Sequence, residues 1–371
     1  MSKTLQDYAT LINDTIQSNE INHYITTDNM CQNLGGIDTF KNINIPQGKV
    51  RSFQKDDVLL SNIRLYFRKV YRAKQKGGCS SDVLVFRAKH IDSATLFAIL
   101  SSQIFTDYAC SGSQGSKMPR GNKTHMMDFK IPTINFTIAK IFNSIQNKIE
   151  NNHKINELLH KILELLYEQY FVRFDFLDEN NKPYQTSGGK MKFSKELNRL
   201  IPNDFEVKTL GELTQLKVGN KNANHSSNQG KYPFFTCSNN PLRCETYQFE
   251  GKHIIISGNG NFYVTHYDGK FDAYQRTYVV NPNNPNHYVL IYLFVKSYTN
   301  YLKLQSRGSI IKFITKSDIE NIKIVLPNLK TYAKWNNVLK MIENNMQSTQ
   351  TLTALRDFLL PLLLNQQVKP Q

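Results

Sequence analysis

Two short stretches decide the fold of this chain: residues 57–61, DVLLS, and residues 253–257, HIIIS. Each has the pattern of a short buried strand that runs directly into a polar loop. Three further pairs follow in the same order: GS at 115–116 and 308–309, FKIP at 129–132 and IVLP at 324–327, and IENN at 149–152 and 342–345. The paired positions differ by 193 to 196 residues throughout. Four matches in one order at a nearly constant spacing predict an internal repeat.

Each copy of the repeat ends in a long stretch with helical periodicity. Apolar residues recur at alternating steps of three and four from Ile138 to Leu166, and again from Trp335 to Leu362. This spacing is typical of a coiled-coil seam, and Asn152 stands at a seam position where a buried amide could fix the register. We therefore expect two equivalent helices that pack on each other, although two unrelated amphipathic helices would show the same periodicity. The residues expected to pack between the helices or against a partner are Ile141, Ile145, Leu159, Ile162, Leu339, Ile342 and Leu355.

Short β-rich runs precede each helical stretch: VLVF at 83–86, YVV at 278–280 and VLIY at 289–292. Loops rich in Gly, Asn and Ser separate them, as in α/β globules. The expected fold class is therefore α/β, with two α/β globules joined by two long helices in an antiparallel coiled coil and a pseudo-twofold internal repeat. The expected boundaries are 1–135 for the first globule, 136–175 for the first helix, 176–204 for a polar connector, 205–326 for the second globule, and 327–371 for the second helix and tail.

The chain is strongly basic. Its 371 residues include 46 Lys and Arg against 30 Asp and Glu, which gives a formal net charge of +16. Nucleic acid is the first candidate partner, because Lys and Arg contacts to phosphates release condensed counterions. A membrane surface is the second candidate, and a Lys- and Asn-rich genome would also raise the lysine count.

The five cysteines indicate neither a metal site nor a disulfide framework. Cys31, Cys79, Cys110, Cys237 and Cys244 form no CxxC pair, and their spacing is irregular. We therefore expect reduced, partly buried thiols and no bound metal. The sequence also has no run of about 18 apolar residues and no secretory signal, so we expect a cytoplasmic location.

The sequence carries no motif of a DNA-modifying enzyme. A P-loop is absent, and the Gly258-Asn259-Gly260 cluster lacks the third glycine of a dinucleotide loop. The stretch 281–284, NPNN, is not the signature of an amino-methyltransferase. Asp204, Glu206 and Lys208 resemble the end of a metal-dependent nuclease motif, but no partner acid stands on a preceding strand. We therefore expect a chain that binds no cofactor and catalyses no reaction.

Two polar loops occupy equivalent positions of the repeat: residues 61–64, SNIR, and residues 257–261, SGNGN. Small polar side chains there allow close approach to phosphates and base edges. For any single residue, a solvated basic face remains the alternative. The residues expected to contact DNA are Asn62, Arg64, Arg68, Lys117, Arg120, Lys221, Asn259, Asn261, Tyr263 and Arg307.

Over nearly its whole length the chain resembles the specificity (S) subunits of type I restriction–modification systems. The junction LLYEQYFVRFDF at 165–176, followed by PYQTSGGKMKFSKELNRLIPNDFEVKTLGEL at 183–213, is similar to the point where such subunits enter their second recognition domain. YPFFTCSNNP at 232–241, IIISGNGNFY at 254–263 and LQSRGSIIKFITKSDIENIKIVLP at 304–327 resemble successive landmarks of that domain. The tail LRDFLLPLLLNQQV at 355–368 resembles the end of the second conserved helix.

The resemblance implies two target recognition domains, here 1–135 and 205–326, that each read one half of a split, asymmetric site in double-stranded DNA. It implies one S subunit held by two methyltransferase (M) subunits, with restriction (R) subunits added for cleavage. The partners, and not this chain, would use S-adenosylmethionine, ATP and Mg²⁺. The first domain is more basic than the second, KDDVLLSNIRLYFRKV against GKHIIISGNGNFYVTH, which fits two different half-sites.

Three alternatives stay open from the sequence. The chain could be the specificity partner of another type of restriction–methylation enzyme. It could be a stand-alone metal-dependent nuclease that uses Asp204, Glu206 and Lys208. It could also be a coiled-coil scaffold with no role on DNA, which salt-sensitive DNA binding would exclude.

Overall fold

The computed structural model describes residues 3–38, 43–131, 134–227, 230–327 and 334–365. The chain divides into two compact units. The first unit comprises residues 1–155 and 344–371, and the second comprises residues 156–343. The boundary cuts both long helices, α5 (Phe136–Tyr167) and α10 (Trp335–Asn365), so each helix contributes one part to each unit.

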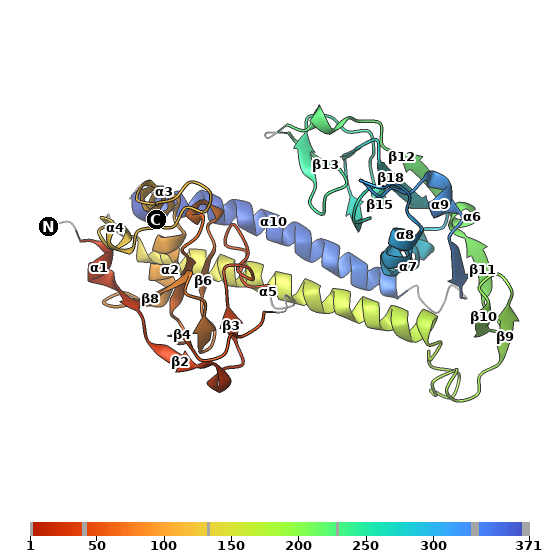
Figure 1. Ribbon diagram of the computed structural model, residues 1–371, viewed down its shortest axis with the longest axis horizontal. Coiled ribbons are helices and arrows are strands. Elements are labelled where there is room, and N and C mark those ends of the chain that lie inside the picture. The colour runs from red at the N-terminus through yellow and green to blue at the C-terminus, as the bar shows by residue number, and fades with distance from the viewer. Residues whose placement is uncertain (1–2, 39–42, 132–133, 228–229, 328–333, 366–371) are drawn as a thin grey trace. The chain divides into compact units, whose positions relative to one another are not determined.

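The first unit is built on two four-stranded sheets (Figure 1). One is antiparallel throughout, in the order β1 (Ala9–Ile12), β8 (Val83–Ala88), β5 (Val58–Ser61), β6 (Val70–Arg72). The other has the order β2 (Thr15–Gln17), β4 (Lys49–Phe53), β7 (Gly77–Cys79), β3 (Tyr24–Ile25), with β3 and β7 parallel. Helix α2 (Ser93–Ser101) packs on β5, β6 and β8, and α1 (Leu5–Tyr8), α3 (Gln103–Ser111) and α4 (Lys123–Met127) complete the unit.

Strand β5 shows why the apolar run at 58–60 is buried on both faces. Side chains alternate along a strand, so Val58 and Leu60 belong to the core that α2 covers. Leu59 points the other way, into a second core with Val85 and Tyr71. A strand between two cores has no solvent face, which explains why the run lacks polar alternation.

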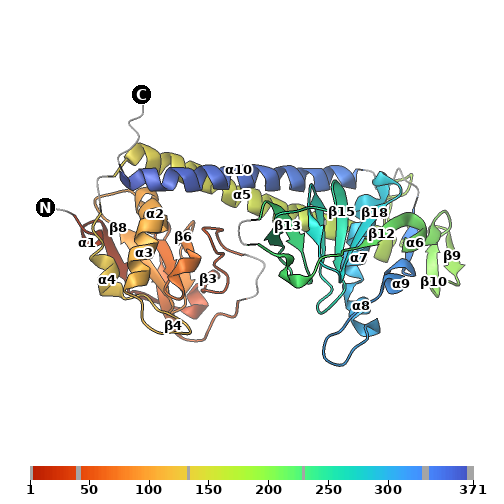
Figure 2. The same ribbon diagram turned by 90° about the horizontal axis from the view of Figure 1, so that it is seen from above.

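The second unit repeats this plan (Figure 2). Its main antiparallel sheet has the order β12 (Thr214–Val218), β18 (Thr277–Pro282), β15 (Lys252–Ser257), β16 (Val264–Asp268). Its smaller sheet has the order β14 (Leu242–Cys244), β13 (Tyr232–Phe235), β17 (Asp272–Ala273). Ile254 and Ile256 face the core shared with α7 (Tyr288–Ser297), while Ile255 faces the other way. The remaining helices are α6 (Leu210–Leu213), α8 (Thr299–Gln305) and α9 (Lys316–Glu320).

The repeat predicted from the sequence is therefore present in the sheets. Ser61 pairs with Val83 at the end of β5, and Ser257 pairs with Thr277 at the end of β15. One match is displaced, however. The amide of Leu5 donates to the carbonyl of Phe129, and that of Leu210 donates to Ile322, so Phe129 corresponds to Ile322 and not to Ile324. A two-residue shift preserves the alternation of a strand, and the sequence pattern could not detect it. Pro132 lies outside the described residues.

The run VLIY at 289–292, predicted as β-rich, is helical. It forms the buried middle of α7. A short, wholly apolar run has no periodicity that separates a buried strand from a buried helix, so β-branched content misled the prediction. With the residues on both sides of it, the run forms a helix of ten residues.

In the first unit the two long helices pack antiparallel. The Asn152 amide donates to the Thr349 hydroxyl at 3.1 Å, and Arg356 donates to the Gln146 side chain at 3.1 Å. The residue numbers of the partners thus increase along α10 as they decrease along α5, which is the order of an antiparallel pair. In the second unit, the Asn156 amide donates to the carbonyl of Ile342. Trp335 packs edge-on against Tyr170 in the same unit.

The helix surface differs from the predicted seam. Ile145, Leu339 and Ile342 are buried, and Leu159 packs against the core of the second unit. Ile141, Ile162 and Leu355 are exposed, by 44%, 46% and 44%, so they do not pack between the helices, and their packing against a partner stays a prediction. Asn152 is buried, as its predicted seam position requires. Gln146 is also buried on α5, although the apolar spacing did not include it.

The predicted connector at 176–204 contains a two-stranded hairpin, β9 (Met191–Ser194) and β10 (Arg199–Pro202). Strand β11 (Glu206–Thr209), at the start of the segment 205–326, pairs with β19 (Lys323–Leu326) at the end of that segment. A π-helical turn, Glu168–Val172, ends α5. Among the helices that the structure describes, none is long and apolar enough to cross a membrane.

Candidate nucleic-acid interface

In the first unit, the loop that follows β5 crosses the hairpin formed by residues 114–120. The amide of Arg64 donates to the carbonyl of Pro119 at 2.9 Å. The carbonyl of Asn62 accepts from Gly121 at 3.2 Å, and its amide donates to Asp82 at 2.8 Å. Main-chain bonds from three segments thus fix the loop, and we call this place the first loop crossing.

The second unit contains the same crossing, between the loop that follows β15 and the hairpin formed by residues 307–313. The amide of Gly260 donates to Lys312 at 2.8 Å, and Ile314 donates to Gly258 at 2.9 Å. The amide of Gly258 donates to Arg276 at 2.7 Å. All three bonds correspond to those of the first unit, so we call this place the second loop crossing.

The two hairpins also share their backbone conformation. Gln114 and Arg120 exchange main-chain hydrogen bonds in both directions, and Arg307 and Phe313 do the same. Gly115 and Gly308, the repeated glycines of the sequence, have φ values of +97° and +100°. Only glycine adopts such a conformation without strain, which explains why Gly-Ser recurs at this position.

The first crossing brings together four of the predicted residues: Asn62, Arg64, Lys117 and Arg120. Lys117 is exposed, and the Arg64 guanidinium donates to its carbonyl at 3.3 Å. Arg120 is also exposed and forms an ion pair with Asp82 at 3.0 Å. Asn62 is buried at the base, where its side-chain oxygen has no hydrogen-bond partner.

Arg68 has a different environment from the other predicted residues. Its guanidinium donates to the carbonyl of Ser101, at the C-terminal end of α2, at 2.9 Å. A cation at this end of a helix interacts favourably with the exposed carbonyls. Burial lowers the pKa of Arg68, while the nearby Asp357 acts in the opposite direction. Arg68 thus has a structural contact of its own, which could not be distinguished from a surface role by its position in the sequence.

The second crossing brings together Asn259, Asn261, Tyr263 and Arg307. The Asn261 amide donates to the Tyr263 hydroxyl at 3.0 Å. The Arg307 guanidinium pairs with Asp318 at 3.0 Å while remaining largely exposed. Lys221 lies on a neighbouring segment, where its main chain forms a bridge with Tyr274.

A pocket of about 430 Å³ opens beside the second crossing. Its wall combines small hydroxyl side chains, the loop amides and an aromatic ring. The lining residues are Ala223, Thr236, Cys237, Ser238, Asn259, Gly260, Asn261, Tyr274 and Ile311. Such a set offers donors, acceptors and apolar contact together, which is what base edges require. Thr236, Ser238 and Tyr274 were not among the predicted residues, because they come from segments outside the repeat landmarks.

Both hairpins carry an exposed apolar side chain at the same position. Met118 is 57% exposed in the first unit, and Ile311 is 61% exposed in the second. Their main-chain neighbours Pro119 and Lys312 accept the equivalent bonds from Arg64 and Gly260. The sequence analysis missed this pair, although extending the repeat from Gly115 and Gly308 by three residues would have found it.

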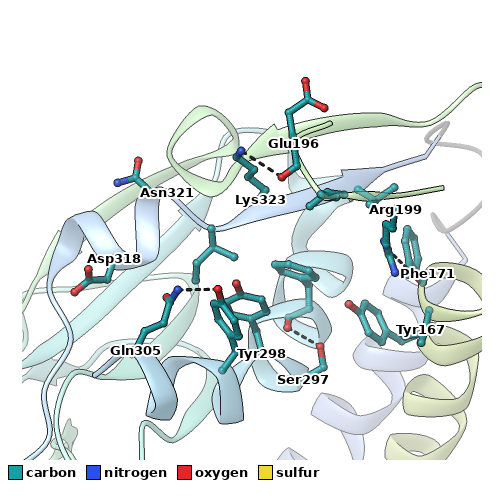
Figure 3. Close-up of a pocket in the computed structure, with 16 residues that line it drawn as sticks. Tyr167, Phe171, Glu196, Arg199, Ser297, Tyr298, Gln305, Asp318, Asn321 and Lys323 are labelled. Atoms are coloured by element: carbon teal, nitrogen blue, oxygen red, sulfur yellow. Dashed lines mark hydrogen bonds between the residues drawn. The ribbon is translucent and has the colours of Figure 1, made fainter. Parts of the chain in front are cut away.

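A second concavity of the second unit, of about 580 Å³, lies where the connector hairpin meets α7 and α8. Figure 3 shows Arg199 beside Phe171, whose carbonyl accepts from it at 3.1 Å. Lys323 likewise donates to the carbonyl of Glu196. Burial lowers the pKa of Arg199. Arg199 and Lys323 are thus bonded to main-chain carbonyls of the same unit, and these bonds attach the connector hairpin to the rest of the unit.

The residues of the nuclease alternative do not form a metal site. Glu206 and Lys208 lie on β11, where they pair with Leu326 and Ile324 of β19. In the part of the chain that the structure describes, the group of side chains with metal-ligand geometry is His225, Cys244 and Asp272, which lies elsewhere. All five cysteines are free thiols.

Comparison with known proteins finds similarity to one kind of protein. Residues 202–355 match the type I restriction modification DNA specificity domain. The EcoDI specificity subunit of a type I restriction enzyme from Escherichia coli is 37% identical over 133 residues, which cover 34% of this chain and 29% of that protein. The MjaIX specificity subunit from Methanocaldococcus jannaschii is 24% identical over 300 residues, 72% of this chain and 67% of that protein.

The fold is that of a solved relative as well. The crystal structure of the type I restriction–modification S subunit from M. genitalium superposes with a TM-score of 0.63 at 16% identity. It covers 98% of this chain and 96% of that one. The alignment with the EcoDI subunit spans less than a third of that protein, whereas the alignment with the solved structure spans both proteins. In its second half by sequence, and over nearly its whole length by fold, the chain is thus similar to type I restriction–modification specificity subunits.

Proposed function

We propose that this chain reads a bipartite, asymmetric site in double-stranded DNA and directs methyltransferase and restriction subunits to it. Each unit would read one half of the site through its loop crossing. The chain itself would catalyse no step. S-adenosylmethionine, ATP and Mg²⁺ would be used by the partners, and the cytoplasmic location predicted from the sequence suits such a complex.

The observation that carries the proposal is the repetition of one backbone crossing with different side chains. The same hydrogen bonds fix Arg64 and Gly260 at equivalent places. A shared scaffold with different side chains is what two readers of different half-sites require. The shared backbone would place each loop in the same way on the phosphates. The different side chains would then fit different base edges.

The surface of the crossings suits DNA more than another polyanion. Lys117 and Arg120 stand on either side of Met118 along the first hairpin, and Arg307 and Lys312 stand on either side of Ile311 along the second. Cations would contact the two phosphate strands, while the apolar side chain would pack on thymine methyl groups or between base steps. A simple polyanion would offer no partner for the apolar tip.

The long helices offer a surface for the partner subunits. On α5, Leu158, Ile162 and Leu165 are exposed and follow one another at steps of four and three, so they share one face of the helix. Large apolar groups in a row on a surface mark an interaction site. We assign this face to the methyltransferase subunits, of which two would bind one S subunit.

The proposal is tested by titrating the full chain with a mixed-sequence DNA duplex at several salt concentrations. Affinity should fall steeply with salt, because each phosphate contact contributes about 0.9 to the slope of log K against log salt. The same sample, supplied with S-adenosylmethionine, ATP and Mg²⁺, should neither methylate nor cut the duplex. Salt-independent binding, or turnover by the chain alone, would contradict the proposal.

A further inference from the structure

Three side chains from separate segments of the second unit converge at its smaller sheet. Cys244 ends β14, Asp272 begins β17, and His225 ends the 3₁₀ turn Ala223–His225. The sulfur, the ring nitrogen and a carboxylate oxygen all lie within 4.8 Å of one another. Cys244 and Asp272 are fully buried, and His225 is half-buried.

The Asp272 carboxylate is incompletely satisfied. Its Oδ2 lies 2.5 Å from the Thr246 hydroxyl, which donates to it, and 3.1 Å from Nε2 of His225. Its Oδ1 is buried and has no hydrogen-bond partner. Among the described ion pairs, His225 is the one cationic partner of this carboxylate. A buried carboxylate oxygen that accepts no hydrogen bond destabilises the fold, and such groups ordinarily have a further partner.

A divalent cation would complete this cluster. Thiolate, imidazole and carboxylate form a mixed soft and borderline donor set, which favours Zn²⁺ over Mg²⁺ or Ca²⁺. Donors around Zn²⁺ lie about 2.0 to 2.3 Å from the metal, and hence roughly 3.3 to 3.8 Å from one another in a tetrahedral site. His225 Nε2 and Asp272 Oδ2 are 3.1 Å apart and all three donors lie within 4.8 Å of one another, so small shifts would seat the ion. The Thr246 hydroxyl is 3.0 Å from His225 Nε2, which leaves the fourth position beside a polar group where water can bind.

We propose that His225, Cys244 and Asp272 bind one Zn²⁺ ion that ties the 223–225 turn to both edges of the smaller sheet. The central strand of that sheet, β13, leads directly into Thr236 and Ser238 of the pocket beside the second crossing. The ion would therefore fix a wall of that pocket and take no part in chemistry. No metal was expected from the sequence, because the three ligands are 19 and 28 residues apart and form no CxxC motif.

The test uses the full chain and does not involve DNA, so its failure is distinct from failure of the proposed recognition. The chain is purified without chelators, its metal content is measured, and the stripped chain is titrated with Zn²⁺ and with Co²⁺. We expect stoichiometric Zn²⁺, a thiolate-to-cobalt absorption band, and a higher Tm with Zn²⁺. Cys244→Ser should abolish the band, and His225→Gln should weaken Co²⁺ binding at least tenfold. Cys237→Ser, a thiol of the same unit outside the cluster, is the matched control and should bind as the parent chain does.

The wild-type titration decides the matter even if Cys244→Ser fails to fold. A wild-type chain that takes up no stoichiometric Zn²⁺ and shows no cobalt–thiolate band would overturn the proposal. Uptake that both cluster variants retain would overturn it too, since the metal would then sit elsewhere. Either result would leave Asp272, His225 and Thr246 as a hydrogen-bonded network without a metal.

Discussion

Arg64 and Gly260 occupy the same position of the two units, and both have a positive φ, of 49° and 74°. The amide of each donates to the hairpin that crosses its loop. An arginine thus adopts in one unit the left-handed conformation that a glycine adopts in the other. The loop keeps its shape while the side chain changes. For this reason we propose that each unit recognises its own half of the DNA site.

Gly260→Arg should strengthen DNA binding by the second unit. A Cβ at Gly260 meets nothing within 4 Å, so the side chain has room, and the left-handed backbone should cost about 1–2 kcal/mol of stability. The added cation should raise the salt slope by about one phosphate contact. Gly251→Arg is the matched control, because Gly251 also has positive φ and open space but precedes β15 instead of following it. Equal gains from both variants would show that charge alone, and not the crossing, attracts DNA.

Met118→Ser and Ile311→Ser should weaken DNA binding without unfolding the chain. Both side chains are more than half exposed, so each change should alter stability by only about 0.5 kcal/mol. Loss of apolar contact with bases should lower affinity for the matching half-site, measured in the assembled complex with cognate DNA. Phe358→Ser removes an exposed apolar group from α10 and should leave DNA affinity of the chain unchanged. If neither hairpin variant binds more weakly, the tips do not touch DNA.

Thr349→Val should destabilise the first unit. The Asn152 amide is buried and donates to the Thr349 hydroxyl, so the valine would leave that donor without its acceptor. The expected loss is about 1–3 kcal/mol in the free energy of unfolding, measured with denaturant. Thr351→Val, on the same helix but exposed, should have little effect. The double variant Asn152→Leu with Thr349→Val should recover part of the loss, and no recovery would count against the pair as a matched contact.

Stability of the second unit should fall in mild acid because of His160. Burial lowers its pKa to about 4, and Lys296 and His266 add to the effect. Its unfolded pKa is about 6.5, so the unfolded chain binds more protons between these values. The stability that is fully present above pH of about 6.5 is therefore lost as pH falls toward 4. His160→Gln should flatten the unfolding free energy between pH 7 and 5, and Lys161→Gln, its neighbour, should not. An unchanged profile in His160→Gln would refute the assignment.

The repeat and its strands could be predicted because period and order survive in the sequence. DVLLS and HIIIS mark the same strand, since a strand buried on both faces needs an unbroken apolar run. Helix packing was harder to predict. Asn152, predicted at a seam position, is buried and bonds to Thr349. Gln146 was not predicted, because it is buried through hydrogen bonds with Leu34 and Arg356, which apolar periodicity cannot represent.

The candidate site was predictable only where it follows the repeat. Arg64 and Asn259 lie in the landmark loops, and the structure places both at the crossings. Arg68 lies four residues further along but turns to the carbonyl of Ser101, because its own left-handed turn redirects the chain. Sheet pairing brings Cys244 and Asp272 together and the 3₁₀ turn adds His225, an arrangement that no spacing in the sequence reveals.

On the proposed function, each unit reads one half of the DNA site independently. A domain exchange tests this: residues 205–326 are replaced with the equivalent segment of a type I specificity subunit, the chimaera is assembled with the proposed methyltransferase partner, and methylated bases are mapped across a genome. One half-site should take the sequence specified by the donor while the other half-site stays as in the parent. A site altered in both halves, or an active complex whose site is unchanged, would contradict it.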